Sequence, residues 1–147
     1  MEQLDEPLAR QIHHRMVHSA QARVFSSDEY NASQMTVLLR SLDFLLTSRY
    51  HACVLSLAAQ VPQVAVGHDL RLKTIYEELG FKEQFFVDPQ APEPCRAAKE
   101  RLEKLMADPA LEREALRQGY EEHLAKAQRN RALLRAFVQT HGWETVA

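Results

Sequence analysis

The stretch DFLLTSRYHACVLSLAAQVPQVAVG, residues 43–67, decides the fold. Two short apolar runs, residues 43–47 and 63–67, flank a longer run, residues 50–61, that is apolar almost all round. Short apolar runs between turn signals are typical of buried strands, and the longer run is typical of a buried helix that ends before Pro62. A strand, a helix and a strand joined by short loops form one βαβ unit, which predicts parallel strands and a right-handed crossover.

The same alternation continues on both sides of this unit. Gly80 suits the left-handed position just past the end of a helix. Taken together, the elements predict an α/β fold, an open parallel sheet of about four strands with helices on both faces, which is Rossmann-like. The expected elements outside residues 43–67 are helices over residues 5–20, 30–40 and 70–79, strands over residues 22–25 and 84–88, and a loop over residues 26–29.

The chain changes character after a proline-rich stretch at residues 89–94. Two helices are expected beyond it, over residues 96–107 and 111–138, separated at Asp108-Pro109. The predicted domains are therefore a Rossmann-like part, residues 1–90, and a helical extension packed on it, residues 91–147. The second helix carries an apolar stripe suited to the sheet, to another domain or to a second copy: Leu116, Tyr120, Leu124, Ala127, Leu134 and Val138.

Composition excludes several classes of protein. With 18 Lys+Arg against 20 Asp+Glu, the net charge of −2 argues against a nucleic-acid binder. No apolar run is long enough for a transmembrane helix, and the acidic N-terminus does not resemble a signal peptide. Cys53 and Cys95 lack the spacing of a zinc site, and His14 and His18 on one helix face have no further ligand nearby, so no metal is expected. These features together favour a reducing cytoplasm.

Chemistry is expected beyond the carboxyl ends of the strands, where helix N-termini favour anions. Three segments occupy such places, residues 26–29, 47–51 and 67–73, and the second is the richest. There a strand-end hydroxyl, Ser48, leads into a helix start with Arg49, which favours a phosphate or carboxylate, and with His51, which could move a proton. The alternative interpretation is a surface arginine and a core histidine. With only four glycines in the chain, a glycine-rich nucleotide loop is nearly excluded.

Asp69 and Lys73 leave a similar choice open. They are either a second wall of the same site or a helix cap followed by an exposed lysine. Further along the chain, residues 96–135 hold ten Lys/Arg against seven Asp/Glu, an excess of three positive charges. We interpret that excess as a solvated helix face rather than as a polyanion site.

Four ordered segments resemble the polysaccharide pyruvyl transferase family, which shows S-R-x-H-A, A-L-A-x-x-V-P, Y-D-x-K and E-x-L-G segments. The resemblance covers roughly residues 8–88 and is best over residues 43–81. It departs from the family pattern at His68, where a tyrosine is usual before the aspartate. The matching segments are SRYHA (48–52), LAAQVP (57–62), VAVGHD (64–69) with Lys73, and ELGF (78–81).

The resemblance implies a GT-B-type enzyme that moves pyruvate from phosphoenolpyruvate onto a sugar of a surface polysaccharide, forming a ketal. It implies that Arg49 and Ser48 bind the donor, that His51 is the catalytic acid–base group, and that Asp69 and Lys73 border the cleft. Phosphoenolpyruvate is then the donor substrate, and no cofactor is expected.

The length of the chain qualifies what the resemblance implies, because the family's chains are longer. The expectation is therefore the C-terminal half alone, with donor-side binding, little turnover by itself, and a missing N-terminal half or another chain as partner. Two alternatives stay open, a nucleotide-sugar-binding half of a GT-B glycosyltransferase and a non-catalytic interaction module, which could be a homo-oligomer through the C-terminal helices.

Overall fold

The structure is a computed structural model that describes residues 2–26 and 28–141. It consists of two compact units, residues 1–38 and residues 39–147, which we describe separately. The first unit contains the helix α1 (Glu2–Arg15), a short 3-10 turn η1 (Ser19–Gln21) and most of α2 (Ala32–Arg40). The second unit contains the sheet, the remaining helices and all of the candidate site residues.

The sheet of the second unit has three parallel strands in the order β1-β2-β3. They are β1 (Leu45–Thr47), β2 (Gln63–Val66) and β3 (Phe86–Val87). Leu45 pairs with Gln63, and Ala65 pairs with Phe86. The predicted open parallel sheet is confirmed, but it has three strands rather than about four.

The missing strand is the one expected over residues 22–25, and that prediction is wrong. This segment has no strand pairing, and the ring of His13 bonds to the carbonyl of Ala22 at 3.0 Å. Arg23 points outward to the hydroxyl of Tyr30 at 2.7 Å and lies over the ring of Phe25. The hydrophobicity of this segment therefore reflects local side-chain packing and not membership of a sheet.

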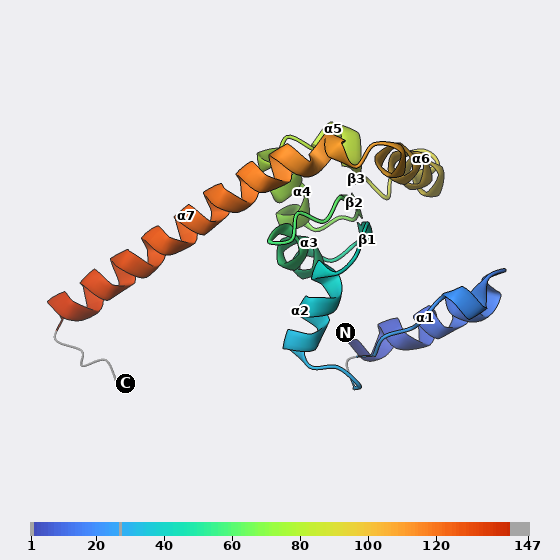
Figure 1. Cartoon of the computed structure of the whole chain (residues 1–147), viewed down its shortest axis with the longest axis horizontal. Helices are drawn as coiled ribbons and strands as arrows, with labels where there is room; N and C mark the ends of the chain where they lie inside the picture. Colours follow the sequence, from blue (N-terminus) through green and yellow to red (C-terminus); the bar gives the residue numbers. More distant parts are fainter. Residues whose placement is uncertain (1, 27, 142–147) are drawn as a thin grey trace. The chain divides into compact units, whose positions relative to one another are not determined.

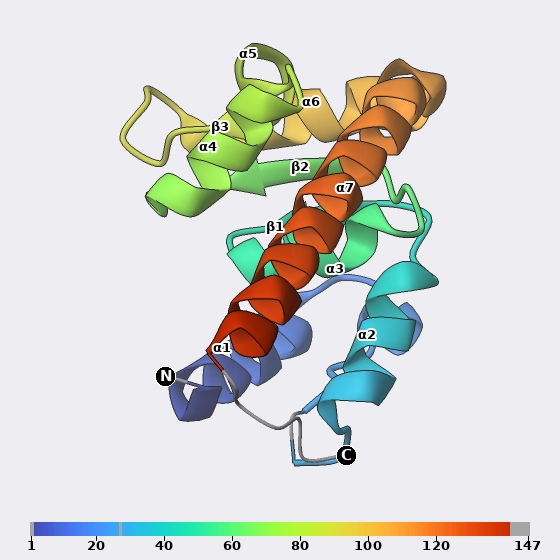
Figure 2. The same cartoon turned by 90° about the vertical axis from the view of Figure 1, so that its left-hand side faces the viewer.

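Helices cover both faces of the sheet (Figure 1). The order of the strands across the sheet is the same as their order in the chain. Right-handed crossovers therefore place α3 (Tyr50–Leu57) and α4 (Leu70–Glu78) on the same face of the sheet. The helix α6 (Pro94–Ala107) packs on β2 and β3 from the opposite face. Figure 2 shows α4 in front of β2, with α6 behind it.

The boundaries of α1, α3 and β3 differ most from the sequence expectation. The helix α1 ends at Arg15 rather than near residue 20, and α3 ends at Leu57, four residues before the expected end, because Gln60 adopts a left-handed backbone with φ 55°. The strand expected over residues 84–88 is shortened to two residues by a short helix, α5 (Lys82–Phe85). Gly80 has φ 74°, as predicted for the residue after α4.

The core lies between the sheet and these helices. Aromatic side chains dominate the part of the core next to β3, where Tyr76 packs against Phe81 and Phe86. The buried cluster comprises Cys53, Leu57, Val64, Ala65, Leu72, Ile75, Tyr76, Leu79, Phe81, Phe85, Phe86, Val87, Ala98, Leu105 and Leu116.

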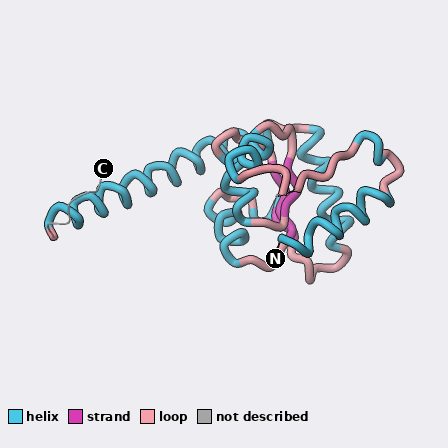
Figure 3. The backbone as a smooth tube through the Cα atoms, turned by 90° about the horizontal axis from the view of Figure 1, so that it is seen from below, coloured by secondary structure: helices cyan, strands magenta, loops and turns pink. Residues whose placement is uncertain are grey.

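The last helix, α7 (Ala110–Thr140), meets this core only through its first third. Leu116 is fully buried, and Gly119 is close enough to α4 that a side chain there would collide with Leu79. Leu124 and Leu134, further along the predicted stripe, are exposed. Beyond its first third, α7 runs away from the sheet (Figure 3). Among the described residues, no helix is both long and apolar enough to span a membrane.

Candidate functional site

The end of β1 and the start of α3 form the first part of the site. Thr47 is buried, and its hydroxyl oxygen accepts a hydrogen bond from the backbone N–H of Arg49 at 2.9 Å. This bond turns the chain sharply out of the sheet, so that Arg49 becomes the N-cap residue of α3 with an extended backbone. Ser48, Arg49 and His51 are exposed as a result. The predicted anion-binding segment therefore lies at the surface, beside a helix N-terminus.

The end of β2 and the start of α4 form the second part. Asp69 is the N-cap residue of α4, and its carboxylate accepts a hydrogen bond from the backbone N–H of Arg71 at 2.9 Å. The guanidinium of Arg71 also donates to both carboxylate oxygens, at 3.1 and 2.8 Å, and these bonds lower the pKa of Asp69. The capping interpretation of Asp69 is therefore observed, and Asp69 also holds Arg71 in place.

The structure brings these two segments together. The backbone oxygen of Ser48 lies 3.6 Å from where a side chain on Gly67 would begin. The guanidinium of Arg71 lies over the ring of Tyr50, 5.1 Å from its centre, and the ring of His51 meets the same ring edge-on. Tyr50, between Arg49 and His51 in the sequence, thus joins α3 to the first turn of α4.

Lys73 lies one turn further along α4. It is half-buried, and its charge helps to lower the pKa of Glu77, after the larger effect of the bond from Lys82 to Glu77. Lys73 therefore follows Asp69 along the same helix, and its positive charge acts on Glu77, one turn further along α4.

The third predicted segment, residues 26–29, does not join the other two. It follows no strand, it belongs to the first unit, and Ser27 lies outside the described residues. The hydroxyl of Ser26 donates to Glu6 at 2.7 Å, which fixes it to α1.

The proposed pairing of His14 with His18 on one helix face is also wrong. The helix α1 ends at Arg15, so His18 lies outside it. Over residues 2–26 and 28–141, no group of three or more His, Cys, Asp or Glu side chains is arranged to hold a metal ion.

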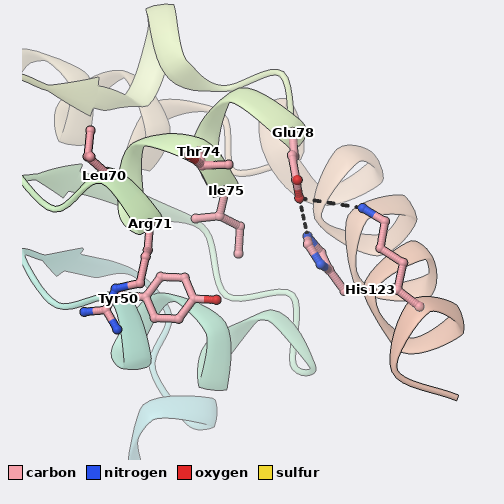
Figure 4. Close-up of a pocket in the computed structure, with 8 residues that line it drawn as sticks. Tyr50, Leu70, Arg71, Thr74, Ile75, Glu78 and His123 are labelled. Atoms are coloured by element: carbon pink, nitrogen blue, oxygen red, sulfur yellow. Dashed lines mark ion pairs between the residues drawn. The ribbon is translucent and has the colours of Figure 1, made fainter. Parts of the chain in front are cut away.

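A pocket that the sequence did not predict opens beside Tyr50 (Figure 4). It has a volume of about 390 Å³ and lies among α3, α4 and α7. At its far end, the carboxylate of Glu78 is 3.2 Å from the ring of His123 and 3.8 Å from the ammonium of Lys126. Its lining comprises Tyr50, Leu70, Arg71, Thr74, Ile75, Glu78, His123 and Lys126.

Sequence reasoning missed this pocket because α7 is distant in the chain from α3 and α4. The available signal was spacing: Arg71, Thr74 and Glu78 share one face of α4, and His123 and Lys126 share one face of α7. Spacing shows which residues share a face, but it does not show which two faces meet.

A buried polar cluster lies at the opposite end of β2 from the site. Glu112 is fully buried, and one of its oxygens accepts a hydrogen bond from the backbone N–H of Gln63 at 2.6 Å. Burial raises the pKa of Glu112 to about 8. Burial, and then the nearby Glu112, raise the pKa of Cys53 to about 12. Cys53 is buried in α3 with a raised thiol pKa, so it is a packing residue and not a thiolate nucleophile.

Comparison with known families agrees with the sequence motifs. The family model described as polysaccharide pyruvyl transferase matches residues 2–69. This range includes Ser48, Arg49, His51 and Asp69, and it ends before Lys73. No curated protein and no solved structure matches the chain. The resemblance predicted from the motifs is thus confirmed: residues 2–69 of this chain match the polysaccharide pyruvyl transferase family.

Proposed function

We propose that the chain is the donor-binding half of an enzyme that transfers pyruvate, as a ketal, from phosphoenolpyruvate to a sugar of a surface polysaccharide. The observation that carries the proposal is the position of Arg49, an exposed cation at the N-cap of α3. It lies within the range of the family match and beside the second strand end of the sheet.

The donor has two anionic groups, a phosphate and a carboxylate. The N-terminus of α3 carries backbone N–H groups and the positive end of the helix dipole, and Arg49 adds a full positive charge. A guanidinium can bind two oxygens of one anion at once, which fixes the orientation of the donor as well as its position. In this proposal Ser48 supplies a hydroxyl to the same anion.

His51 is proposed as the acid–base group. Protonation of the donor's methylene carbon makes the neighbouring carbon electrophilic, and a first sugar hydroxyl adds to it while losing its own proton. A second hydroxyl of the same sugar then forms the second C–O bond of the ketal, losing its proton as the C–O bond to phosphate breaks and inorganic phosphate leaves. An imidazole is the side chain best suited to such transfers near neutral pH. His51 is exposed in the first turn of α3, beside Tyr50 and two residues after Arg49.

Asp69 and Lys73 are proposed to border the same site. Because the carboxylate of Asp69 is bound to Arg71, its part would be to hold that guanidinium at the edge of the donor site. Lys73 would add positive charge to the second wall.

A thermal-shift titration tests the donor site. Phosphoenolpyruvate should raise the melting temperature of the unaltered chain, because a ligand that binds only the folded state stabilises it. The Arg49→Ala variant should lose this shift while keeping its own melting temperature within a few degrees, since Arg49 is exposed. Lys99→Ala, which removes an exposed cation from α6, is the matched control and should keep the full shift. An equal shift in the Arg49→Ala variant would rule out this assignment.

A further inference from the structure

The distal part of α7 has the composition of a helix that lies on a surface. We call this part, Leu124–Thr140, the distal arm. Leu124, Leu133, Leu134 and Phe137 are 42%, 60%, 63% and 49% exposed, which is unusual for side chains of this size.

The charge of the distal arm has one sign only. It carries Lys126, Arg129, Arg131 and Arg135, and the sequence has no Asp or Glu between Glu122 and Glu144. The rest of the chain is acidic, because the net charge of the whole chain is −2. Lys126 is ion-paired with Glu78 of α4, so the excess positive charge of the distal arm lies on Arg129, Arg131 and Arg135. This local charge is hidden in the composition of the whole chain.

The cations flank the apolar residues around the helix. At about 3.6 residues per turn, Phe137, Leu134, Ala127 and Val138 fall on one side of the distal arm. Lys126 lies at one edge of that side, next to Phe137, and Arg131 lies at the other edge, next to Val138, while Arg129 and Arg135 lie further round the helix. Long arginine side chains at such edges can extend their charges outward while their carbon chains stay with the apolar residues.

We propose that the distal arm binds the surface of an anionic lipid bilayer, lying in the plane of the interface with its apolar side buried. A basic amphipathic helix with leucine and phenylalanine on one side is the form that interfacial helices take. The positive edges would bind the negative headgroups, and Leu134, Phe137 and Val138 would enter the boundary with the acyl chains.

Charge and hydrophobicity favour this partner over two others. If the distal arm paired with the distal arm of a second copy, Arg129, Arg131 and Arg135 of each chain would face like charges, which is repulsive. A nucleic acid would bind the cations but would leave the exposed leucines and Phe137 in water. An anionic bilayer satisfies both the charge and the apolar side.

Vesicle cosedimentation of the full chain tests the proposal. The unaltered chain should pellet with vesicles of phosphatidylcholine and phosphatidylglycerol, and should pellet weakly with pure phosphatidylcholine. The triple variant Arg129→Gln, Arg131→Gln, Arg135→Gln should lose roughly a hundredfold in partition onto anionic vesicles. A control triple variant, Arg15→Gln, Lys99→Gln, Arg113→Gln, loses the same charge from other exposed positions and should bind normally.

A second variant separates insertion from simple charge attraction. Leu133→Ser with Leu134→Ser should also weaken binding by at least tenfold, with the helix content unchanged by circular dichroism. Three results would overturn the proposal: no binding to anionic vesicles, equal binding to neutral vesicles, or full binding by the Leu133→Ser, Leu134→Ser variant. Light scattering that shows a stable dimer without vesicle binding would point to a second copy instead.

Discussion

At the scale of single residues, the candidate site combines groups that the sequence identified with a geometry that it could not show. Arg49 and His51 could be found because a helix start after a buried strand is a recognisable place for anion chemistry, and because the surrounding motif resembles a family. The ties of Tyr50 to Arg71 and of Arg71 to Asp69 could not be found. They depend on how two neighbouring helix starts face each other.

Glu112 is the residue whose behaviour the sequence hid most completely. An acidic residue in the first turn of a helix is ordinarily exposed and charged, yet Glu112 is fully buried beside Gln63, Cys53 and Tyr76. Burial raises its pKa from an ordinary value of 4.5 to about 8, so it is protonated at neutral pH.

The titration of Glu112 predicts how stability changes with pH. Because the pKa of the folded state exceeds that of the unfolded state, the stabilising contribution is complete below about pH 4.5 and is lost as the pH rises toward 8. Glu112→Gln removes this titration and should flatten the pH dependence of the unfolding free energy over that range. Urea denaturation at several pH values measures it, with exposed Glu114→Gln as the control. An unchanged slope in Glu112→Gln would contradict the assignment.

At the scale of elements, the βαβ unit over residues 43–67 could be predicted because its apolar runs have lengths that suit only buried elements. The segment over residues 22–25 has a similar apolar character but pairs with nothing, since a run of four residues does not reveal whether a sheet edge is available. The same limit applies to the short apolar run at β3. Phe85 ends α5 and the next residue, Phe86, begins β3, and the run itself does not show this division.

The helix α7 provides a test at this scale, because its two parts should respond differently to the same change. Leu116→Ala removes a fully buried side chain and should cost about 2–5 kcal/mol of unfolding free energy. Leu134→Ala, which is 63% exposed, should change the unfolding free energy by less than about 0.5 kcal/mol. Chemical denaturation measures both variants. Similar costs at the two positions would mean that the distal arm is packed against the core.

At the scale of the whole molecule, the chain combines three regions with different properties. The second unit presents two strand ends that together make the proposed donor site, α7 continues past the core, and the distal arm carries a local positive charge on an acidic chain. Composition could exclude a strongly basic protein, but averaging over the chain concealed the charge of the distal arm.

The most direct test of the central claim, donor binding at the start of α3, is hydrogen–deuterium exchange of the whole chain with and without phosphoenolpyruvate. Donor binding there should slow exchange over residues 47–53 and 67–71, with no such slowing in the Arg49→Ala variant and with Lys99→Ala behaving like the unaltered chain. Unchanged exchange over both segments in the unaltered chain at saturating donor, or equal slowing in the Arg49→Ala variant, would contradict it.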